Sequence, residues 1–255
     1  YRVYGRDLPW RNTRAPYKIF VSEVMLQKTQ VESVVPKYER FIAAFPDFET
    51  LSRAPLRKIL ALWKGLGYNR RALYLKKSAQ KVMDEYGGRL PREPEALANL
   101  PGIGRATAAS VAAFAFNAPV FFIETNIRRT FIHHFFPERA DVRDEELMPF
   151  VMRMLDRDNP RAWYNALMDY GATLKRRVPN PNRRSRAYVK QAPFAGSDRE
   201  IRGKILAALL GRPQQTARTI AMAVGSDRRR VLRCLRRLQG EGILRYAQNF
   251  FTITS

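Results

Sequence analysis

Two glutamates in this chain have sequence surroundings that suit acid–base chemistry. Glu23 lies in the apolar stretch 21–26, and burial there should raise the pKa of its carboxyl group and keep a proton on it near neutrality. Glu124 follows the apolar run 121–123, and Asn126 stands two residues later, where it should cap or steer this acid. Two carboxyl groups in different environments can protonate a leaving group and stabilise a developing positive charge.

A glycine-containing turn offers a second kind of chemistry, the binding of an anion. The segment Leu100–Ala108 places Gly102 and Gly104 two residues apart, between two predicted helices. Backbone N–H groups at such a turn, next to a helix N-terminus, can hold a phosphate. The segment lacks the Lys-Ser/Thr ending of a nucleotide-binding loop and follows no predicted strand. We predict a helix, hairpin, helix unit that binds phosphate through Gly102, Gly104, Arg105 and Thr107; an ordinary helix–helix corner is the alternative.

The amino-acid composition indicates a globular protein with an anionic partner. The 255 residues include 46 Lys+Arg and 23 Asp+Glu, which gives a formal net charge of +23. With 45% hydrophobic residues the chain can build ordinary cores, so intrinsic disorder is not expected. This excess of positive charge is costly by self-repulsion unless a polyanion balances it. Nucleic acid is therefore the favoured partner, and an anionic membrane surface is the weaker alternative.

A single cysteine, Cys234, limits the metal chemistry of the chain. It cannot form an internal disulfide, and a structural zinc site or a four-thiolate iron–sulfur cluster needs several thiolates. We expect no metal, no cofactor and a reducing compartment. No apolar run approaches the length of about 18 to 20 residues that spans a membrane, and residues 1–10 lack the apolar core of a secretory signal. These features predict a soluble intracellular protein of the cytoplasm or nucleoid, without membrane contact.

The hydrophobic periodicity predicts helices throughout the first 171 residues. Pro16 can begin a helix that runs to about Thr29, and further prolines separate short helices joined by tight turns. The absence of alternating strand patterns there is typical of an all-α fold. Residues 175–197 combine turn-forming residues with many arginines and are predicted to be a basic linker that lies along phosphates.

A separate winged-helix unit is predicted over residues 198–255. Its pattern indicates helices over 199–210, 216–223 and 228–238, and strands over 243–246 and 250–254. The third helix has apolar residues at core-facing spacing: Val231, Leu232, Leu235 and Leu238. We expect DNA contacts from the arginines of its other face: Arg228, Arg229, Arg230 and Arg233. A partner-binding or merely solvated helix is the alternative.

The hairpin segment Leu100–Ala108 resembles that of the helix-hairpin-helix (HhH-GPD) DNA glycosylase superfamily, which includes endonuclease III and the MutY-type adenine glycosylases. Five further motifs follow the MutY-type pattern in the same order: Pro9–Arg11, Pro16-Tyr17, Ser22–Val31, Gly65–Tyr68 and Met168–Ala172. The resemblance covers most of residues 5–175. It implies a two-lobed, all-α fold with a DNA-binding cleft. One lobe is a six-helix barrel over residues 17–117, and the other is a flanking helical domain made of residues 1–16 and 118–174.

The resemblance implies a monofunctional DNA glycosylase of base excision repair, a monomer that acts on double-stranded DNA with a mismatch or lesion. Such an enzyme flips out a base, adenine being favoured, and hydrolyses its N-glycosidic bond to leave an abasic site. In this pattern Glu23 protonates the base, at N7 of a purine. Glu124 takes the place of an Asp and would stabilise the sugar cation or orient water. A thymine or uracil mismatch glycosylase on the same scaffold, and a catalytically silent DNA-binding protein, are the alternatives.

Other positions of the family pattern imply further roles. Relatives that also cleave the strand carry a nucleophilic Lys where this chain has Ala106, which implies no lyase activity. Gln27 and Tyr68 look like the residues that enter the gap beside the opposite base. Arg11 would line the base pocket or clamp a phosphate.

The chain departs from the MutY-type pattern after Ala172. MutY-type enzymes usually have four cysteines there that hold an iron–sulfur cluster, whereas this chain has no cysteine before Cys234. We expect arginines to supply the phosphate contacts of that loop directly: Arg176, Arg177, Arg183, Arg184 and Arg186. The family's C-terminal domain, which reads 8-oxoguanine, is not recognisable, and the winged-helix segment stands in its place.

Overall fold

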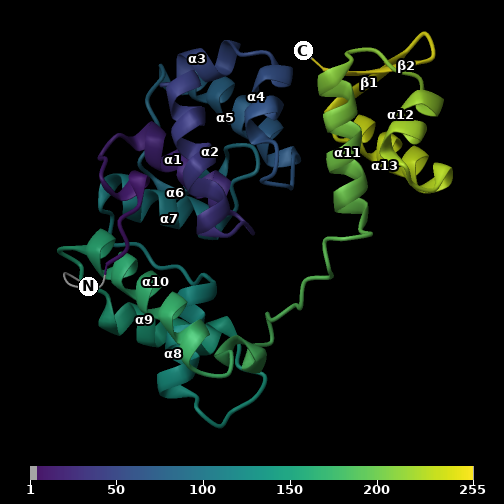
Figure 1. Cartoon of the computed structure of the whole chain (residues 1–255). Helices are drawn as coiled ribbons and strands as arrows, with labels where there is room; N and C mark the ends of the chain where they lie inside the picture. Colours follow the sequence, from purple (N-terminus) through teal and green to yellow (C-terminus); the bar gives the residue numbers. More distant parts are fainter. Residues whose placement is uncertain (1–4, 255) are drawn as a thin grey trace. The chain divides into compact units, whose positions relative to one another are not determined.

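The computed structural model describes residues 5–254, and Figure 1 shows its elements in chain order. Up to Lys190 the described chain forms helical elements: η1 (Pro9–Arg11), α1 (Pro16–Leu26), α2 (Val31–Ala44), α3 (Phe48–Arg53), α4 (Leu56–Trp63), α5 (Arg70–Tyr86), α6 (Pro94–Ala98), α7 (Arg105–Phe116), α8 (Thr125–Phe135), α9 (Asp144–Met154), α10 (Pro160–Arg177) and η2 (Pro181–Arg184). Then follow α11 (Asp198–Gly211), α12 (Ala217–Val224), α13 (Arg228–Gly240), β1 (Leu244–Ala247) and β2 (Phe250–Ile253). The predicted all-α fold with a small winged helix is confirmed.

The chain forms two compact units. The first comprises Tyr1–Glu23, Pro91–Asn99 and Ile103–Lys190, and the second comprises Val24–Leu90, Leu100–Gly102 and Gln191–Ser255. Residues 1–4 of the expected N-terminal segment and residue 255 of the predicted winged helix lie outside the described residues. Across residues 5–254, every helix is too short or too polar to cross a lipid bilayer.

Helices α7, α8 and α10 build the core of the first unit. Helix α8 packs along α10 and against η2. The rings of Phe114, Phe122 and Tyr164 meet in this core, and those of Phe122 and Tyr164 stack with centroids 4.2 Å apart. The Tyr164 hydroxyl donates to the Val120 carbonyl oxygen at 2.7 Å, so the buried ring keeps a partner for its polar end. This packing fixes the extended segment that leads to Glu124.

Helices α2 to α5 form the core of the second unit. Helix α3 lies along α5, and α4 contacts both α2 and α5. Asp47 caps α3 by accepting from the Thr50 N–H, and Gly87 ends α5 in the left-handed conformation. Phe41 makes an edge-to-face contact with fully buried Trp63, the last residue of α4. The loop that carries Tyr68 therefore starts from a buried anchor.

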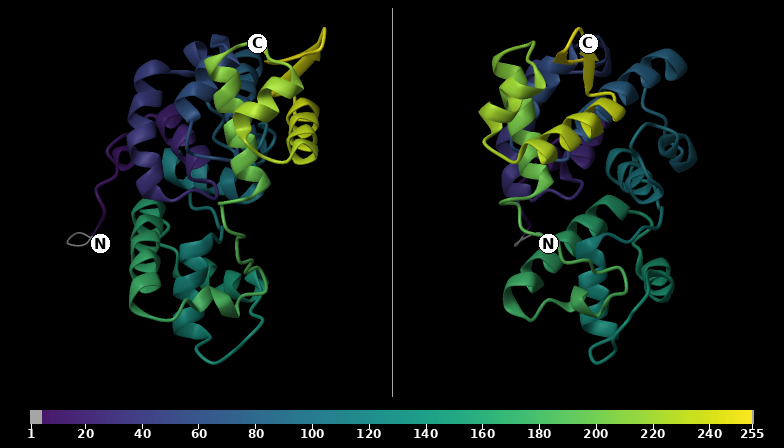
Figure 2. Two further views of the ribbon diagram at one scale, coloured as in Figure 1. Left: turned by 45° about the vertical axis from the view of Figure 1, so that its right-hand side comes forward. Right: turned by 90° about the vertical axis from the view of Figure 1, so that its right-hand side faces the viewer.

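The winged helix consists of α11, α12, α13 and the hairpin β1–β2. Ser197, Thr216 and Asp227 cap the three helices through their side chains. Strands β1 and β2 pair antiparallel, from Leu244↔Ile253 to Ala247↔Phe250. Figure 2 shows this short hairpin beside α13. Each helix and strand predicted for this unit is present, with small shifts at the ends.

One residue of α13 differs from the prediction. The buried side of α13 is made by Val231, Cys234, Leu235 and Leu238. Leu232 is only half-buried and lies among arginines, because its position on the helix turns it away from the core. Cys234 has no exposed surface, as expected for a small apolar side chain.

The basic segment after α10 is more structured than predicted. Helix α10 continues through Arg177, and η2 follows it closely. Asn182 is buried, and its Nδ2 donates to the Thr125 carbonyl oxygen at 3.0 Å. The linker predicted over residues 175–197 is therefore wrong in its first part, because contacts of this kind fold the segment onto α8. The remaining part, residues 187–197, contains no helix or strand.

Candidate active site

Glu23 projects from α1 toward α7 in the first unit. Its Oε2 lies 2.7 Å from the Ser110 Oγ. Desolvation of the carboxyl group raises the pKa of Glu23 to about 7, and the nearby charge of Glu124 raises it further, while Ser110 and the charge of Arg11 oppose these effects. The raised pKa agrees with the prediction that Glu23 keeps a proton near neutrality.

Ser110 can serve either protonation state of Glu23. Its hydroxyl oxygen also lies 2.9 Å from the Thr107 carbonyl oxygen, and a single hydroxyl proton can satisfy only one of the two acceptors. When the hydroxyl donates to Thr107, its oxygen can accept the proton of a neutral Glu23. When the hydroxyl turns to Glu23, it donates to the carboxylate. Glu23 can therefore hold or release a proton without losing its partner.

Glu124 is the N-cap of α8. Its Oε1 accepts from the backbone N–H groups of Asn126 and Ile127, at 2.7 and 3.0 Å. Burial raises the pKa of Glu124 above its ordinary value, and these two donors and two nearby arginines offset only part of that rise. The helix N-terminus also favours a negative charge at this point. Glu124 thus has more hydrogen-bond donors for its anion than Glu23, whose charged form has one donor, Ser110, among residues 5–254.

The expected capping relation between Asn126 and Glu124 is reversed, because Glu124 caps the backbone of Asn126. The Asn126 Nδ2 still reaches the Glu124 Oε2 at 3.4 Å, and its Oδ1 accepts from Arg129 at 2.7 Å. Buried Arg129 also donates to the Gly171 carbonyl oxygen at 2.7 Å. A Cβ on Gly171 would lie 2.4 Å from the Asn126 carbonyl oxygen. Glycine is therefore required where α10 meets the first turn of α8.

Asp169 of α10 anchors the segment that precedes α1. Arg11 donates to its two carboxylate oxygens at 2.7 and 2.8 Å, and Arg6 adds two bonds at 3.0 and 2.6 Å. Burial alone would raise the pKa of Asp169, but these bonds outweigh it and hold the pKa below its ordinary value. The guanidinium of Arg11 is thus occupied by a buried ion pair. This speaks against the phosphate clamp and leaves Arg11 close enough to influence Glu23.

The glycine turn has the geometry of a helix-hairpin-helix. Helix α6 ends at Ala98, α7 begins after Gly104, and the two helices pack together. Gly102 has a φ of +76°, and a Cβ there would lie 2.5 Å from the Tyr74 ring, so glycine is required. Arg105 is exposed in the first turn of α7. Thr107 is half-buried in the same turn.

Buried Arg71 holds together the two loops that carry Gln27 and Tyr68. It donates at 2.7–3.1 Å to four carbonyl oxygens, those of Val24, Met25, Leu66 and Gly67. Desolvation lowers the pKa of Arg71 to about 10, and the carbonyl dipoles at the end of α1 favour its charge.

The two predicted wedge residues, Gln27 and Tyr68, belong to the second unit. Helix α1 ends at Leu26, earlier than predicted, because the next turn takes left-handed backbone at Lys28. The Gln27 Nε2 donates to the Gly102 carbonyl oxygen at 3.3 Å. Tyr68 also has a positive φ, +46°. Glu23, Glu124, Asn126 and Arg11 instead belong to the first unit. There Glu124 and Arg11 lie near enough to act on the charge of Glu23.

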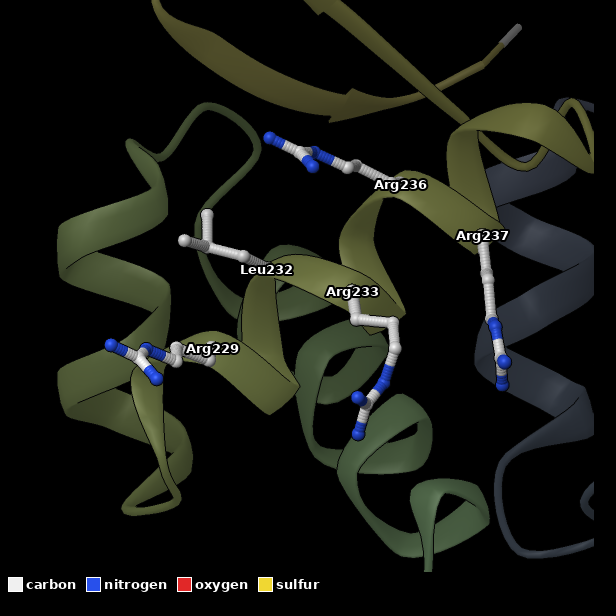
Figure 3. A pocket seen from close by; sticks show the side chains of 5 residues that line it. All are labelled: Arg229, Leu232, Arg233, Arg236 and Arg237. Carbon is white, nitrogen blue, oxygen red and sulfur yellow. The ribbon is translucent and has the colours of Figure 1, made fainter.

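Helix α13 carries an exposed arginine cluster. A cavity of about 500 Å³ is lined by Arg229, Leu232, Arg233, Arg236 and Arg237, with no acid in its lining. Figure 3 shows these five side chains projecting from α13. Arg228 is also exposed.

Arg230 does not belong to this cluster. It pairs with Asp198 at 2.8 Å and donates to the Gly196 carbonyl oxygen at 2.9 Å, so it fastens α13 to the start of α11. The DNA contact predicted for Arg230 is therefore not supported, because its guanidinium already has partners. Arg236 extends the cluster, and Arg237 lines it as well while its Nη1 lies 3.5 Å from the Asp198 Oδ2.

The arginines predicted to supply the phosphate contacts of the iron–sulfur loop fall into two sets. Arg176, Arg177 and Arg183 are exposed. Arg184 is half-buried and donates to the Ile132 carbonyl oxygen at 3.4 Å. Its position in the fold assigns Arg184 to packing against α8 rather than to a free cationic surface.

The residues after α10 do not fit an iron–sulfur cluster. Residues 178–186 contain no thiol, and the one cysteine of the sequence, Cys234, is buried in α13. Within residues 5–254 no three His, Cys, Asp or Glu side chains are grouped so that they could hold a metal. The Asn180 side chain instead caps η2 by accepting from the Asn182 N–H. This short turn closes the loop without thiolate ligands.

The sequence analysis assigned no function to three residues of the site. Ser110 is the one polar residue in the apolar stretch 108–116, which is a signal that could have revealed it. Asp169 lies in a matched motif, but its partners stand more than 150 residues away. Arg129 follows Arg128 directly, and nothing in the sequence separates the buried arginine from the half-buried one.

Comparison with known proteins identifies the family. A model of the HhH-GPD superfamily of base excision DNA repair proteins matches residues 21–151. This chain belongs to that superfamily. The adenine DNA glycosylase of Mycolicibacterium smegmatis is 35% identical over 224 residues, which cover 80% of this chain and 75% of that protein. The adenine DNA glycosylase of Buchnera aphidicola subsp. Baizongia pistaciae is 35% identical over 179 residues, covering 68% and 50%. The mouse adenine DNA glycosylase is 34% identical over 224 residues, covering 82% and 42%.

Solved structures of the HhH-GPD type share the fold. A thermostable thymine-DNA glycosylase is 30% identical with a TM-score of 0.58, covering 66% of this chain and 78% of that one. An endonuclease III in a non-covalent DNA complex gives a TM-score of 0.59 at 20% identity, covering 69% and 81%, and shows likeness of fold alone. The chain spans about half the length of the Buchnera and mouse relatives.

Proposed function

We propose that this HhH-GPD protein is a monofunctional DNA glycosylase that removes a mismatched or damaged base, with adenine as the favoured substrate. The observation that carries the proposal is the pairing of two unlike carboxyl groups. Glu23 has a pKa of about 7, whereas Glu124 is capped by backbone N–H groups. The names of the matched relatives, adenine DNA glycosylases, support adenine as the base.

The two acids have separate roles in the proposed reaction. The target nucleotide leaves the base stack, and Glu23 donates its proton to the base, at N7 of adenine, as the bond from the sugar carbon to the base breaks. The bonding electrons leave with the base. Glu124, as an anion, stabilises the positive charge on the sugar or orients the water that adds to it. The product is an abasic site.

The residue after Arg105 supports a reaction without strand cleavage. An amine nucleophile at this position would form a covalent intermediate with the sugar, whereas Ala106 offers no such group. The protein is thus proposed to release the base by hydrolysis alone.

DNA binding is assigned to separate cationic and backbone groups. The hairpin, through Gly102, Gly104, Arg105 and Thr107, is proposed to hold a phosphate. Further contacts with the phosphate backbone are proposed for the winged-helix domain, residues 198–255, and for three exposed arginines: Arg176, Arg177 and Arg183. The barrel over residues 17–117 and its flanking domain, residues 1–16 and 118–174, are proposed to bind the duplex. We further propose a monomer that acts on mismatched or damaged double-stranded DNA in the cytoplasm or nucleoid.

The test is incubation with a panel of end-labelled duplexes that carry single mismatched, oxidised or deaminated bases, followed by alkali. Cleavage of the adenine-containing mismatches only after alkali is the expected result. Glu23→Gln should abolish the product and keep DNA binding. Strand cleavage without alkali would contradict the monofunctional reading, and binding with no abasic product from any duplex would leave only a DNA-binding protein.

Thymine is the second candidate base. It is supported by the likeness to a solved thymine-DNA glycosylase at 30% identity. In the same panel, alkali-labile product from thymine mismatches, with intact adenine mismatches, would favour it.

A further inference from the structure

Helix α5 holds the first part of the hairpin turn, Leu100–Gly102, which belongs to the same compact unit. The Ser78 hydroxyl donates to the Pro101 carbonyl oxygen at 3.0 Å. A Cβ on Gly102 would lie 2.5 Å from the Tyr74 ring, so this ring packs directly against the turn. The Gly102 carbonyl oxygen already accepts from Gln27. Two carbonyl dipoles that would repel a phosphate therefore have donors within the protein.

Two cations lie on the face of α5 that carries Tyr74. Arg70 stands four residues before Tyr74 and Lys77 three residues after it, so the three side chains are neighbours on the helix surface. The guanidinium carbon of Arg70 lies 4.8 Å from the centroid of the Tyr74 ring. One ring therefore contacts both the hairpin turn and a cation.

Both cations are accessible to an anionic ligand. Arg70 and Lys77 are exposed, and in the described part of the chain neither pairs with an acid. The acids of α5, Asp84 and Glu85, lie at its C-terminal end, and Glu85 pairs with Lys81 at 3.5 Å. The contact with Tyr74 restricts the conformations of Arg70, so that less entropy is lost when this side chain binds a ligand.

We propose that Arg70 and Lys77 bind two phosphates of one DNA strand that runs along α5 beside the hairpin turn. Seven residues of helix separate the two cations by about 10 Å, the axial rise of about three nucleotides of a B-DNA strand. A guanidinium and an ammonium are both good phosphate ligands. The inference rests on the proposed function, in which the chain binds a duplex around its target base, and it adds a side-chain phosphate surface on α5 to the hairpin.

Neutralisation of single phosphates tests this without any need for catalysis. The duplex carries a tetrahydrofuran abasic analogue at the target position, which fixes the register of the protein, and a methylphosphonate replaces one phosphate at a time on both strands. Each linkage that a cation contacts should weaken binding of the full chain about fivefold at about 0.15 M salt, which is the counterion contribution of one contact relative to about 1 M salt.

The variants identify which cation contacts which phosphate. Arg70→Gln should bind the unmodified duplex about fivefold more weakly and should no longer respond to one neutral linkage, because the contact is already lost. Lys77→Gln should lose its response to a second linkage, about three nucleotides away on the same strand.

Arg40→Gln is the matched control, because Arg40 is an exposed arginine of α2 in the same unit. It should keep the wild-type response at both linkages. Equal thermal unfolding midpoints would show that the variants are folded, as expected for exposed side chains.

Wild-type responses at every linkage in folded Arg70→Gln and Lys77→Gln would overturn the inference, as would a wild-type chain with no sensitive linkage, or two linkages that lie on different strands. Base excision by a chain whose responses do not depend on Arg70 or Lys77 would remove this surface and leave the proposed function standing. Responses that depend on both residues, in a chain that excises no base, would do the reverse.

Discussion

Glu23 and Glu124 differ because their charged forms have different numbers of partners. In the described part of the chain, the Glu23 carboxylate has one neutral donor, Ser110, whereas Glu124 has two backbone N–H groups at a helix N-terminus. Burial raises the pKa of both groups, but the donors favour the anion much more at Glu124. Environments that separate the behaviour of two acids are what a reaction with one proton donor and one anion requires.

The first prediction concerns Ser110. Its hydrogen bond lowers the pKa of Glu23, so Ser110→Ala should raise that pKa above about 7. Carbon-13 NMR titration of the Glu23 carboxyl group, assigned by its loss in Glu23→Gln, measures the shift. Ser22→Ala is the control, because the Ser22 hydroxyl donates to the Ile19 carbonyl oxygen and not to Glu23. An unchanged or lower pKa in Ser110→Ala would contradict the role given to this serine.

The second prediction concerns stability. Folding raises the pKa of Glu23 from 4.5 to about 7, so between these pH values the native state keeps a proton that the unfolded chain releases. The contribution of Glu23 to the free energy of unfolding therefore falls as pH rises from 4.5 to 7. Glu23→Gln should be more stable than wild type at pH 8, by up to about 3 kcal/mol, and equally stable below pH 4. Chemical unfolding at both pH values checks this; equal stability at pH 8 would argue against a buried carboxyl group.

At the scale of the element, the start of α8 is what fixes Glu124. Arg129 joins Asn126 of α8 to Gly171 of α10, and the missing Cβ of Gly171 allows the two helices to meet. The hydrophobic pattern predicts these helices from the sequence. It could not predict their contact, because the partners lie more than 40 residues apart.

The third prediction follows from that contact. Gly171→Ala should push the first turn of α8 away from α10 and displace Glu124, because the added methyl group meets backbone rather than a movable side chain. A displacement near 1 Å can slow catalysis about 100-fold. The measurements are single-turnover excision and thermal unfolding. Gly203→Ala is the control, since Gly203 lies inside α11 with open space around it; this change should stabilise the helix by about 0.5–1 kcal/mol. A wild-type excision rate in Gly171→Ala would contradict the account.

At the scale of the whole molecule, the charge and the hydrophobic pattern of the sequence predicted the elements of the fold but not the long-range contacts between side chains. The helical fold, the hairpin and the winged helix follow from local periodicity and turn residues. Arg11 pairs with Asp169 across 158 residues of sequence, and Ser110 pairs with Glu23 across 87. No local pattern specifies such pairs. For the same reason Arg230 could not be told from its neighbours on α13 until Asp198 was placed beside it.

The fourth prediction concerns the arginines of α13. If Arg229 and Arg233 contact phosphates, the double variant with Gln at both positions should lower the slope of log K against log salt by about 0.9 for each lost contact. Filter binding to an undamaged duplex over a range of salt concentrations measures the slope. Arg230→Gln changes the same helix at an arginine already paired with Asp198 and should keep the slope. An unchanged slope in the double variant would remove α13 from the DNA interface.

The most direct measurement is the single-turnover rate of adenine excision as a function of pH, with saturating protein. If Glu23 donates the proton, the wild-type rate is constant at low pH and falls tenfold per pH unit above about 7, the pKa of Glu23. Glu23→Gln should be inactive at every pH while it binds the duplex. A wild-type rate that stays constant to pH 9, or excision by Glu23→Gln, would contradict the assignment of Glu23 as the proton donor.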